Sequence, residues 1–460
     1  MQAQSSKMRL SASFVLSILP KKVRNVLMLV LVACVAPSCV IQKPDETPFQ
    51  QAAYYKNTSE SINNSKPISI TGDTLQVGWA KVNITPPAGT PLAGYGKRLG
   101  MKYKTVHDSV WVRTFAFDNG QSKAVLITLD MLIAPMSVAA GLETEYEKLD
   151  LKPDQVYLTA THTHTSFGGW GKKPAGRVMA GKYKKAVVKQ TVQHIIQSIK
   201  LAQVRQQPAR VGYGTANGAA LIQNRLTGSV TERDTTIRFM KFEQAGGASA
   251  ILTTFSAHPT ILPSMQPILS RDYPGVLVDE LEKNVNFAAF AAGAVGSHNT
   301  VYKYGDTFRS VTETGTQLAK IILREANQLK TAYTSELSTH KIELALPEPH
   351  WRLGDNKRLA PGLFYAVFGK YKAHLNHLQI GNTVLLGVPA DYSGEFMAEL
   401  ETAAKSNGKN VLVTGFNGSY IGYIIPEKHY QLRKYEARDM NFYGRQSGTY
   451  ITQLLLQLLY

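Results

Sequence analysis

The chain has 460 residues, 44% of them hydrophobic, which is enough for two or three average domains or for one large enzyme domain. Cys34 and Cys39 are its only cysteines, so the chain beyond them has neither disulfides nor thiolate metal sites, and any metal there must be held by histidine, carboxylate or tyrosine. The formal net charge of +18 favours anionic partners or a solvated basic surface, and because no nucleic-acid motif accompanies it we expect no nucleic-acid partner.

The first 39 residues have the pattern of an export signal. Lys21, Lys22 and Arg24 form a basic segment. The apolar residues 26–33 that follow have the length of a signal-peptide core and are too short to span a bilayer. Leu31-Val-Ala-Cys34 resembles a bacterial lipobox with Cys34 as the lipid-carrying residue, and a poorer match ends at Cys39. The alternative is an ordinary cleaved signal with two incidental cysteines. We expect a lipoprotein signal at 1–39 and a chain anchored in the bacterial cell envelope, facing the periplasm or the cell surface.

Residues 40–75 are polar and rich in Ser, Asn, Gln and Pro, which predicts a flexible tether. Beyond them, strand-like and helix-like patterns alternate, and Asp118-Asn119-Gly120 indicates a hairpin between the first two of these strands. Strands are predicted at 109–117, 123–130, 156–161, 250–255, 286–293, 383–388 and 410–416, and helices at 181–202, 307–327 and 446–460. This alternation indicates the α/β class with mixed β-sheets flanked by helices. Because no linker interrupts residues 76–460, we treat them as one large domain.

Two histidines follow the strand predicted at 156–161. His162 and His164 stand at positions i and i+2, which points both side chains to the same face, and Gly168-Gly169 allows backbone to approach a ligand. Imidazole is the commonest metal ligand, so the pair can begin a zinc site. On its own, the motif fits a hydrogen-bonded histidine pair near a surface equally well.

Further polar side chains stand where other apolar strands end. They are His258, Asp391 with Glu395 four residues later, Tyr420 with Tyr423, and Ser297. Each has an ordinary structural alternative: a hydrogen-bonded histidine, a helix cap, a packing tyrosine or a turn serine. No G-x-S-x-G motif is present, so Ser297 does not indicate a serine hydrolase. Together the strand ends indicate an active site assembled from distant parts of one α/β domain.

Several segments, in one order, resemble the catalytic domain of the neutral/alkaline ceramidase family. The similarity runs through most of residues 76–445, and a series of motifs is far more specific than any one of them. The matching segments are Val77–Pro87, Leu92–Gly96, Thr161–His164 with Gly168-Gly169, Asn224-Arg225, Phe255–Pro259, Ser270–Gly275, Tyr420–Tyr423, Lys434–Glu436 and Phe442–Gly444.

The resemblance implies an amide hydrolase that holds one zinc ion per chain. The implied zinc ligands are His162, His258, a carboxylate and Tyr423. His164 is implied beside the metal, as a hydrogen-bonding or proton-transfer group. Arg225 and Ser297 are implied to contact the substrate around the scissile bond.

The sequence also departs from the family. Asp391 stands where the family has Glu and reaches about one methylene less far, so Glu395 is a second candidate for the carboxylate ligand. The family's Gly-Asp-Val-Ser-Pro-Asn segment is replaced here by residues 294–299, which lack its Asp. We expect a single catalytic domain without the family's C-terminal β-sandwich.

The predicted function is cleavage of the N-acyl amide of ceramide or a related lipid-like substrate. Metal-activated water attacks the amide carbonyl, Tyr423 or Arg225 stabilises the oxyanion, and His164 returns a proton to the leaving amine. The expected partners are the lipid-like substrate and the membrane surface, with no obligate protein partner. Two alternatives stay open: the same site acting on another N-acyl or ester substrate of the envelope, and a non-catalytic envelope-binding lipoprotein.

Overall fold

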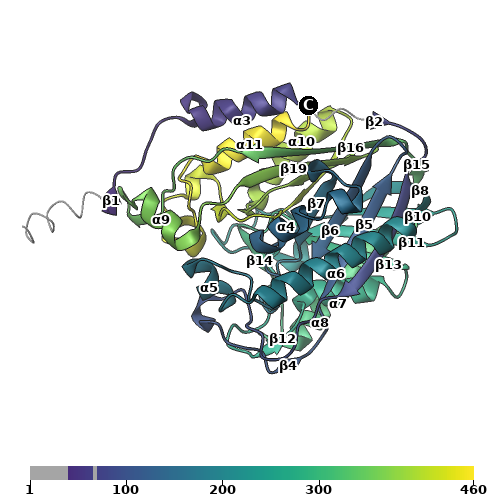
Figure 1. Cartoon of the computed structure of the whole chain (residues 1–460), viewed down its shortest axis with the longest axis horizontal. Coiled ribbons are helices and arrows are strands. Elements are labelled where there is room, and N and C mark those ends of the chain that lie inside the picture. The colour runs from purple at the N-terminus through teal and green to yellow at the C-terminus, as the bar shows by residue number, and fades with distance from the viewer. Residues whose placement is uncertain (1–39, 66–69) are drawn as a thin grey trace, which may run out of the picture.

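The computed structural model describes residues 40–65 and 70–460 (Figure 1). The predicted signal segment, with Cys34 and Cys39, lies outside the described residues. Among the helices that are described, none is both long enough and apolar enough to cross a membrane.

A nine-stranded mixed sheet forms the larger half of the fold. Its main path is β13-β11-β10-β8-β3-β5-β6-β7, and β15 pairs with β8. The strands are β3 (Gln76–Asn83), β5 (Trp111–Asp118), β6 (Lys123–Leu129), β7 (Val156–Ala160), β8 (Gln207–Asn217), β10 (Thr236–Gln244), β11 (Ser249–Phe255), β13 (Phe287–Ala292) and β15 (Ala332–Tyr333). The pairs β6–β7 and β11–β13 are parallel, so their carboxyl ends point the same way within each pair. The predicted hairpin is confirmed, since β5 and β6 pair antiparallel across residues 119–122.

A five-stranded sheet of order β2-β16-β19-β20-β22 packs against one face of the larger sheet. Its strands are β2 (Ile70–Thr71), β16 (Glu336–Leu344), β19 (Ala373–Ile380), β20 (Thr383–Gly387) and β22 (Asn410–Thr414). Successive side chains along a strand of this sheet point to opposite faces and so belong to two cores. Leu385 and Leu412 point toward the larger sheet, where they share a core with Phe115. Val384 and Val411 point the opposite way. The two sheets therefore enclose an apolar layer.

Helices cover the two outer faces, which gives an α/β/β/α arrangement (Figure 1). On the nine-stranded side are α4 (Met136–Glu143), α6 (Lys185–Val204), α7 (Asp272–Leu281) and α8 (Phe308–Gln328). On the five-stranded side are α3 (Ala53–Asn64), α10 (Met397–Ser406) and α11 (Ser447–Gln457). The α/β class with mixed sheets flanked by helices is confirmed.

Shorter elements lie around the place where the carboxyl ends of β7 and β11 come together. The helices there are α5 (Pro174–Ala180) and α9 (Pro361–Phe368). The strands are β1 (Ile41–Gln42), β9 (Ile222–Asn224), β14 (His298–Thr300), β17 (Arg352–Gly354), β18 (Lys357–Leu359), β21 (Asp391–Tyr392) and β23 (Tyr423–Ile424).

The flexible tether predicted at 40–75 is wrong for the described part of that segment. Helix α3 packs along α11, and Phe49 and Ile62 are 2% and 0% exposed in the core beneath the five-stranded sheet. Because α3 lies on the surface, its outer face is polar, and that face accounts for the composition that suggested a tether.

Candidate metal and catalytic site

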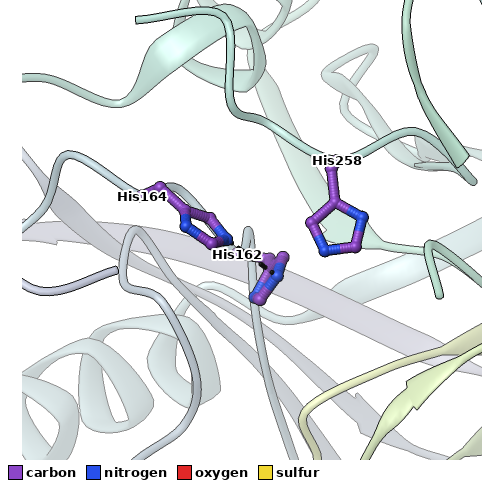
Figure 2. Close-up of side chains that lie close together, drawn as sticks. All are labelled: His162, His164 and His258. Carbon is purple, nitrogen blue, oxygen red and sulfur yellow. Dashed lines mark hydrogen bonds between the residues drawn. The ribbon is translucent and has the colours of Figure 1, made fainter. Parts of the chain in front are cut away.

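Three histidines from two distant segments form one buried cluster (Figure 2). Nε2 of His164 lies 3.1 Å from Nε2 of His162. The ring centroids of His162 and His258 are 4.8 Å apart, and one nitrogen of each of the three rings lies within 4.8 Å of the others. The ends of β7 and β11 therefore meet, and the predicted His-x-His pair faces the third predicted histidine.

Asp391 and Tyr423 complete the group around His258. Oδ1 of Asp391 lies 3.0 Å from Nε2 of His258 and 3.4 Å from Nε2 of His162. The Tyr423 hydroxyl lies 3.1 Å from the same His258 nitrogen. Strand β21 pairs in parallel with β23, so Asp391 and Tyr423 are register partners. Four of the five residues predicted as zinc ligands thus surround one point.

The hydrogen bonds behind the histidines show that this point suits a cation. Nδ1 of His162 lies 2.6 Å from the Leu132 carbonyl, and Nδ1 of His258 lies 2.9 Å from the Val295 carbonyl. Because a carbonyl only accepts, both Nδ1 atoms carry the proton and both Nε2 atoms present a lone pair. Those lone pairs face Oδ1 of Asp391, which has no hydrogen-bond donor among the described residues. Converging nitrogen and oxygen acceptors of this kind are the donor set that zinc takes.

The charge states also suit a metal. Burial, with the neighbouring Arg225, lowers the pKa of His258 to about 3, and burial beside the other two histidines holds the pKa of His164 well below its usual value. For Asp391, burial works to raise the pKa, but the adjacent His162 and His258 lower it well below its usual range. Neutral imidazoles and an ionised carboxylate are the forms in which these side chains bind metals.

The backbone at His162 is strained. His162 has a φ of 61° and Phe416, whose ring stacks on the imidazole at 3.8 Å, has a φ of 65°. A left-handed conformation at a residue other than glycine costs about 1–3 kcal/mol and persists only where the surroundings enforce it. The stacked pair therefore fixes the direction of the His162 ring at an energetic cost that packing offsets.

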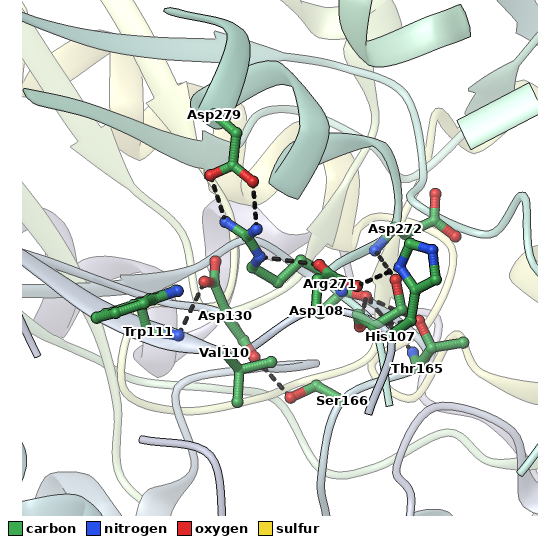
Figure 3. A network of polar contacts seen from close by, with 12 residues as sticks. His107, Asp108, Val110, Trp111, Asp130, Thr165, Ser166, Arg271, Asp272 and Asp279 are labelled. Carbon is green, nitrogen blue, oxygen red and sulfur yellow. Dashed lines mark hydrogen bonds and ion pairs between the residues drawn. The ribbon is translucent and has the colours of Figure 1, made fainter. Parts of the chain in front are cut away.

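Side chains that alternate with the histidines anchor their loop from behind (Figure 3). The hydroxyls of Thr163 and Thr165 donate to the Ser270 carbonyl at 3.2 and 3.0 Å. The Ser166 hydroxyl donates to the Asp130 carbonyl at 2.6 Å. The loop is thereby fixed to the segment before α7 and to the end of β6.

Arg271 holds the segment before α7 in place (Figure 3). Its guanidinium donates to Oδ2 of Asp108 at 2.9 Å and forms two bonds to the carboxylate of Asp279, at 3.0 and 2.5 Å. Arg271 is almost fully buried, so these charge-assisted bonds satisfy a group that would otherwise be costly to bury. They fix the carbonyl of Ser270 on which the histidine loop rests.

Gly94 is expected to be essential for the position of His164. Its φ is +114°, and a Cβ there would lie 2.6 Å from the His164 carbonyl oxygen. Gly94→Ala should therefore lower the free energy of unfolding by roughly 2 kcal/mol more than Gly89→Ala does. Gly89 is the matched control because its φ is +81° with no atom within 4 Å of an added Cβ. Denaturant unfolding measures both variants, and equal losses would show that the contact with His164 carries no cost.

Arg225, the residue after β9, contacts the side chains around His258. Its guanidinium donates to the Tyr423 hydroxyl at 2.8 Å, and its Nε pairs with Glu436 at 2.8 Å. The backbone N–H of Arg225 donates to the Ser297 carbonyl at 2.9 Å. Both side chains predicted to stabilise an oxyanion thus lie side by side next to His258.

Part of the cluster lines a pocket of about 270 Å³. His162, His164, Asp391 and Tyr423 contribute polar groups to its wall, and most of the rest is apolar or aromatic. Those walls include Leu132, Ile133, Met136, Trp170, Met179, Phe364, Phe368, Ile421, Met440 and Phe442. A pocket of this kind accepts an apolar chain and presents one polar group of the ligand to the cluster.

Residues 75–307 match the family described as neutral/alkaline non-lysosomal ceramidase, N-terminal, and they make up half of the chain. The chain belongs to this family. The range includes His162, His164, Arg225 and His258, whereas Asp391 and Tyr423 lie beyond it.

Individual ceramidases show how far the likeness extends. The neutral ceramidase of Pseudomonas aeruginosa is 26% identical over an alignment of 243 residues, and the match covers 48% of this chain and 36% of that protein. The match thus spans about a third of the length of that relative. The crystal structure of the neutral ceramidase from Pseudomonas aeruginosa superposes with a TM-score of 0.74 at 19% identity, over 84% of this chain and 74% of that chain. A ceramidase complexed with C2 gives a TM-score of 0.73 at 19% identity, over 84% of this chain and 75% of that chain. These structures show that the ceramidase fold extends well beyond residue 307.

Ser297 lies in this ceramidase-family fold but outside the pocket wall. Its side chain is fully buried and its hydroxyl lies 2.6 Å from that of Ser393. Its link to the site is the carbonyl that accepts from Arg225. The structure therefore places Ser297 behind Arg225.

Glu395 lies away from the histidine cluster, in the 3-10 turn that Ser393 caps. Its carboxylate contacts Nε2 of His429 at 2.8 Å and accepts from Nδ2 of Asn224 at 3.2 Å. With Glu232 and His429 it forms a second group of possible metal ligands, but Lys428 already pairs with both carboxylates. Of the two carboxylates left open by the sequence, the structure places Asp391 beside the histidines.

Tyr420 is a site residue that the family motif contains but to which the sequence assigned no role. Its hydroxyl donates to Oδ2 of Asp391 at 2.6 Å, and its side chain lines the pocket. The bond holds the carboxylate from the side opposite the histidines and leaves Oδ1 free for a ligand. The signal was its position three residues before Tyr423 in one short segment.

Tyr420→Phe should lower zinc affinity by about tenfold. A hydrogen bond to a charged group contributes about 1.5–3 kcal/mol, and about 1.4 kcal/mol corresponds to a tenfold change. Competition with a chromophoric chelator measures the change. Tyr443→Phe is the matched control, since it removes a hydroxyl from the pocket wall beside Phe364. Equal affinities for the Tyr420 variant and the wild type would show that the bond does not support the metal.

Proposed function

We propose that the chain is a zinc-dependent amidohydrolase that cleaves the N-acyl amide of ceramide or a related lipid-like substrate. The observation that carries the proposal is the presence of a cation-ready group in the wall of a largely apolar pocket. Membership of the ceramidase family supports the same reaction class. His162, His258, Asp391 and Tyr423 would hold one zinc ion, which when bound acidifies a coordinated water and polarises a carbonyl oxygen.

The residues around the metal position would stabilise the charge on the amide oxygen and transfer a proton to the amine. The Tyr423 hydroxyl and the Arg225 guanidinium are hydrogen-bond donors to an amide oxygen that gains negative charge. Glu436 pairs with Nε of the guanidinium, and the terminal Nη2 contacts both the Tyr423 hydroxyl and Nε2 of His258. His164, neutral and half-buried in the pocket wall, would take up the proton that the attacking water loses and pass it to the leaving amine.

The apolar walls bind the acyl chain and exclude water from the reacting amide. We further propose that the chain is anchored in a bacterial cell envelope through a lipid on Cys34, with Cys39 as the second candidate. The support is the lipobox-like segment and the basic and apolar residues before it.

The test is hydrolysis of purified substrates by the zinc-loaded protein. An N-acyl sphingoid base, an N-acyl amino acid and a fatty-acid ester of matched chain length are offered, and released fatty acid is quantified. We expect release from the N-acyl sphingoid base, loss of release in excess chelator, and recovery on adding zinc. Release only from the amino-acid conjugate or the ester would contradict the substrate, and no release from any of them would favour a binding lipoprotein.

A further inference from the structure

Two short helices line the pocket. On one side, Ala175 and Gly176 of α5 line the pocket; on the other, Phe364 and Phe368 of α9 do so, and the two helices pack against each other. Figure 1 shows α5 and α9 together at one end of the molecule, with β1 beside them. The inner faces of these helices therefore belong to the pocket wall, and their exposed residues form the protein surface outside that wall.

The outer faces are unusually apolar for a solvent-exposed surface. Leu363 of α9 is 41% exposed, Leu353 of β17 is 51% exposed and Val178 of α5 is 45% exposed. Helix α9 has the sequence PGLFYAVF and carries no charged side chain at all. A surface helix of a soluble protein normally presents polar residues outward, so an apolar outer face indicates contact with another apolar phase.

Basic side chains accompany this apolar surface. The exposed ones are Lys172, Lys173 and Arg177 at α5, Lys357 in β18, and Lys370 and Lys372 after α9. Asp355, in the turn between β17 and β18, is the exposed acidic residue among these segments. Exposed positive charges on the same segments as exposed leucines complement the anionic headgroups and the acyl region of a lipid bilayer.

The N-terminal segment joins the fold at the same place. The carbonyl of Val40 accepts a hydrogen bond of 2.8 Å from the N–H of Ala360, directly before α9, and β1 pairs with β18. Val40 and Ile41 are themselves exposed. Cys34, the predicted lipid-carrying residue, stands only six residues before Val40 in the chain.

We propose that the outer faces of α5 and α9 and the β17–β18 turn form a docking surface for an anionic lipid bilayer, beside the pocket. Leu353 and Leu363 enter the acyl region while the lysines contact the headgroups. A lipid substrate then enters the pocket from the bilayer without crossing water. Docking does not require catalysis, so it stands or falls separately from the proposed reaction.

The test is binding of the purified full chain to vesicles of phosphatidylcholine, with and without phosphatidylglycerol. We expect tighter binding to the anionic vesicles, weakened by added salt because the headgroup contacts are screened. The double variant Leu353→Glu/Leu363→Glu should bind them at least tenfold more weakly. Val204→Glu, at a residue 79% exposed at the end of α6, is the matched control and should change binding less than twofold.

Hydrogen exchange of the wild-type chain locates the contact independently of any variant. We expect anionic vesicles to protect residues 172–178 and 352–372. Because all the variants share residues 1–39, binding carried by that segment alone would leave the double variant equal to the wild type. That result, or protection confined to other regions, would overturn the proposal.

Discussion

Replacing His258 by alanine should abolish zinc binding and reduce hydrolysis of the N-acyl lipid by about a thousandfold or more. Nε2 of His258 lies at the centre of the site, 3.0 Å from Oδ1 of Asp391, 3.1 Å from the Tyr423 hydroxyl and 3.3 Å from the Arg225 guanidinium. Loss of a partner that merely orients a ligand costs about 10–100-fold, so loss of a ligand costs more. The empty space would also leave the Tyr423 hydroxyl without the imidazole nitrogen that it contacts.

The matched control is His429→Ala. His429 is also a buried histidine bonded to a carboxylate, but it contacts Glu395 and lies outside the histidine cluster. Zinc content after dialysis, initial rates and thermal unfolding are measured for both variants and the wild type. Full activity in the His258 variant, or equal zinc loss in both variants, would contradict the assigned site.

Asp391→Asn should lower zinc affinity by at least about a hundredfold, whereas Glu395→Gln should leave it within a few-fold of the wild type. Oδ1 of Asp391 faces two imidazole lone pairs and has no donor among the described residues, so this oxygen gains a direct partner when a cation binds. An uncompensated buried charge costs about 3–5 kcal/mol, which corresponds to more than a hundredfold in affinity. Glu395 already has partners in His429 and Asn224.

A chelator-competition titration separates the two carboxylates. Asp391→Glu is added as a third variant, because it restores the residue that the family has at this position and lengthens the side chain by one methylene. We expect it to retain zinc. Loss of zinc in the Glu395 variant with retention in the Asp391 variant would reverse the assignment.

The two carboxylates also show where the sequence stops being informative. The four-residue spacing of Asp391 and Glu395 permits a helix that starts at Asp391 and carries Glu395 in its first turn. In the structure, Asp391 pairs with Tyr423 in a short parallel bridge, and Ser393 instead caps the turn that follows. A two-residue bridge between segments 32 positions apart leaves no periodic pattern, so only the folded chain reveals it.

Elements with strong local signals are predicted well. The Asp118-Asn119-Gly120 turn and the alternating apolar residues on either side of it specify the β5–β6 hairpin. Apolar runs that end in His162 and His258 are strands, β7 and β11. These strands lie near opposite ends of the strand order, and they come together because the sheet curls until β13 contacts β7, which no local pattern predicts.

Features that depend on burial are not predicted. Helix α3 was missed because its polar outer face dominates its composition, although Phe49 and Ile62 are buried. Ser297 follows a buried strand in a glycine-flanked turn, which fits a pocket residue equally well, yet its hydroxyl bonds to Ser393. The bond from Tyr420 to Asp391 depends on side-chain direction, which neither spacing nor composition specifies.

Elemental analysis of the purified wild-type chain tests the central claim most directly. The assembly of His162, His258, Asp391 and Tyr423 around one point predicts about one zinc ion per chain after incubation with zinc and dialysis. No bound zinc after that treatment would contradict the metal site and, with it, the proposed hydrolase.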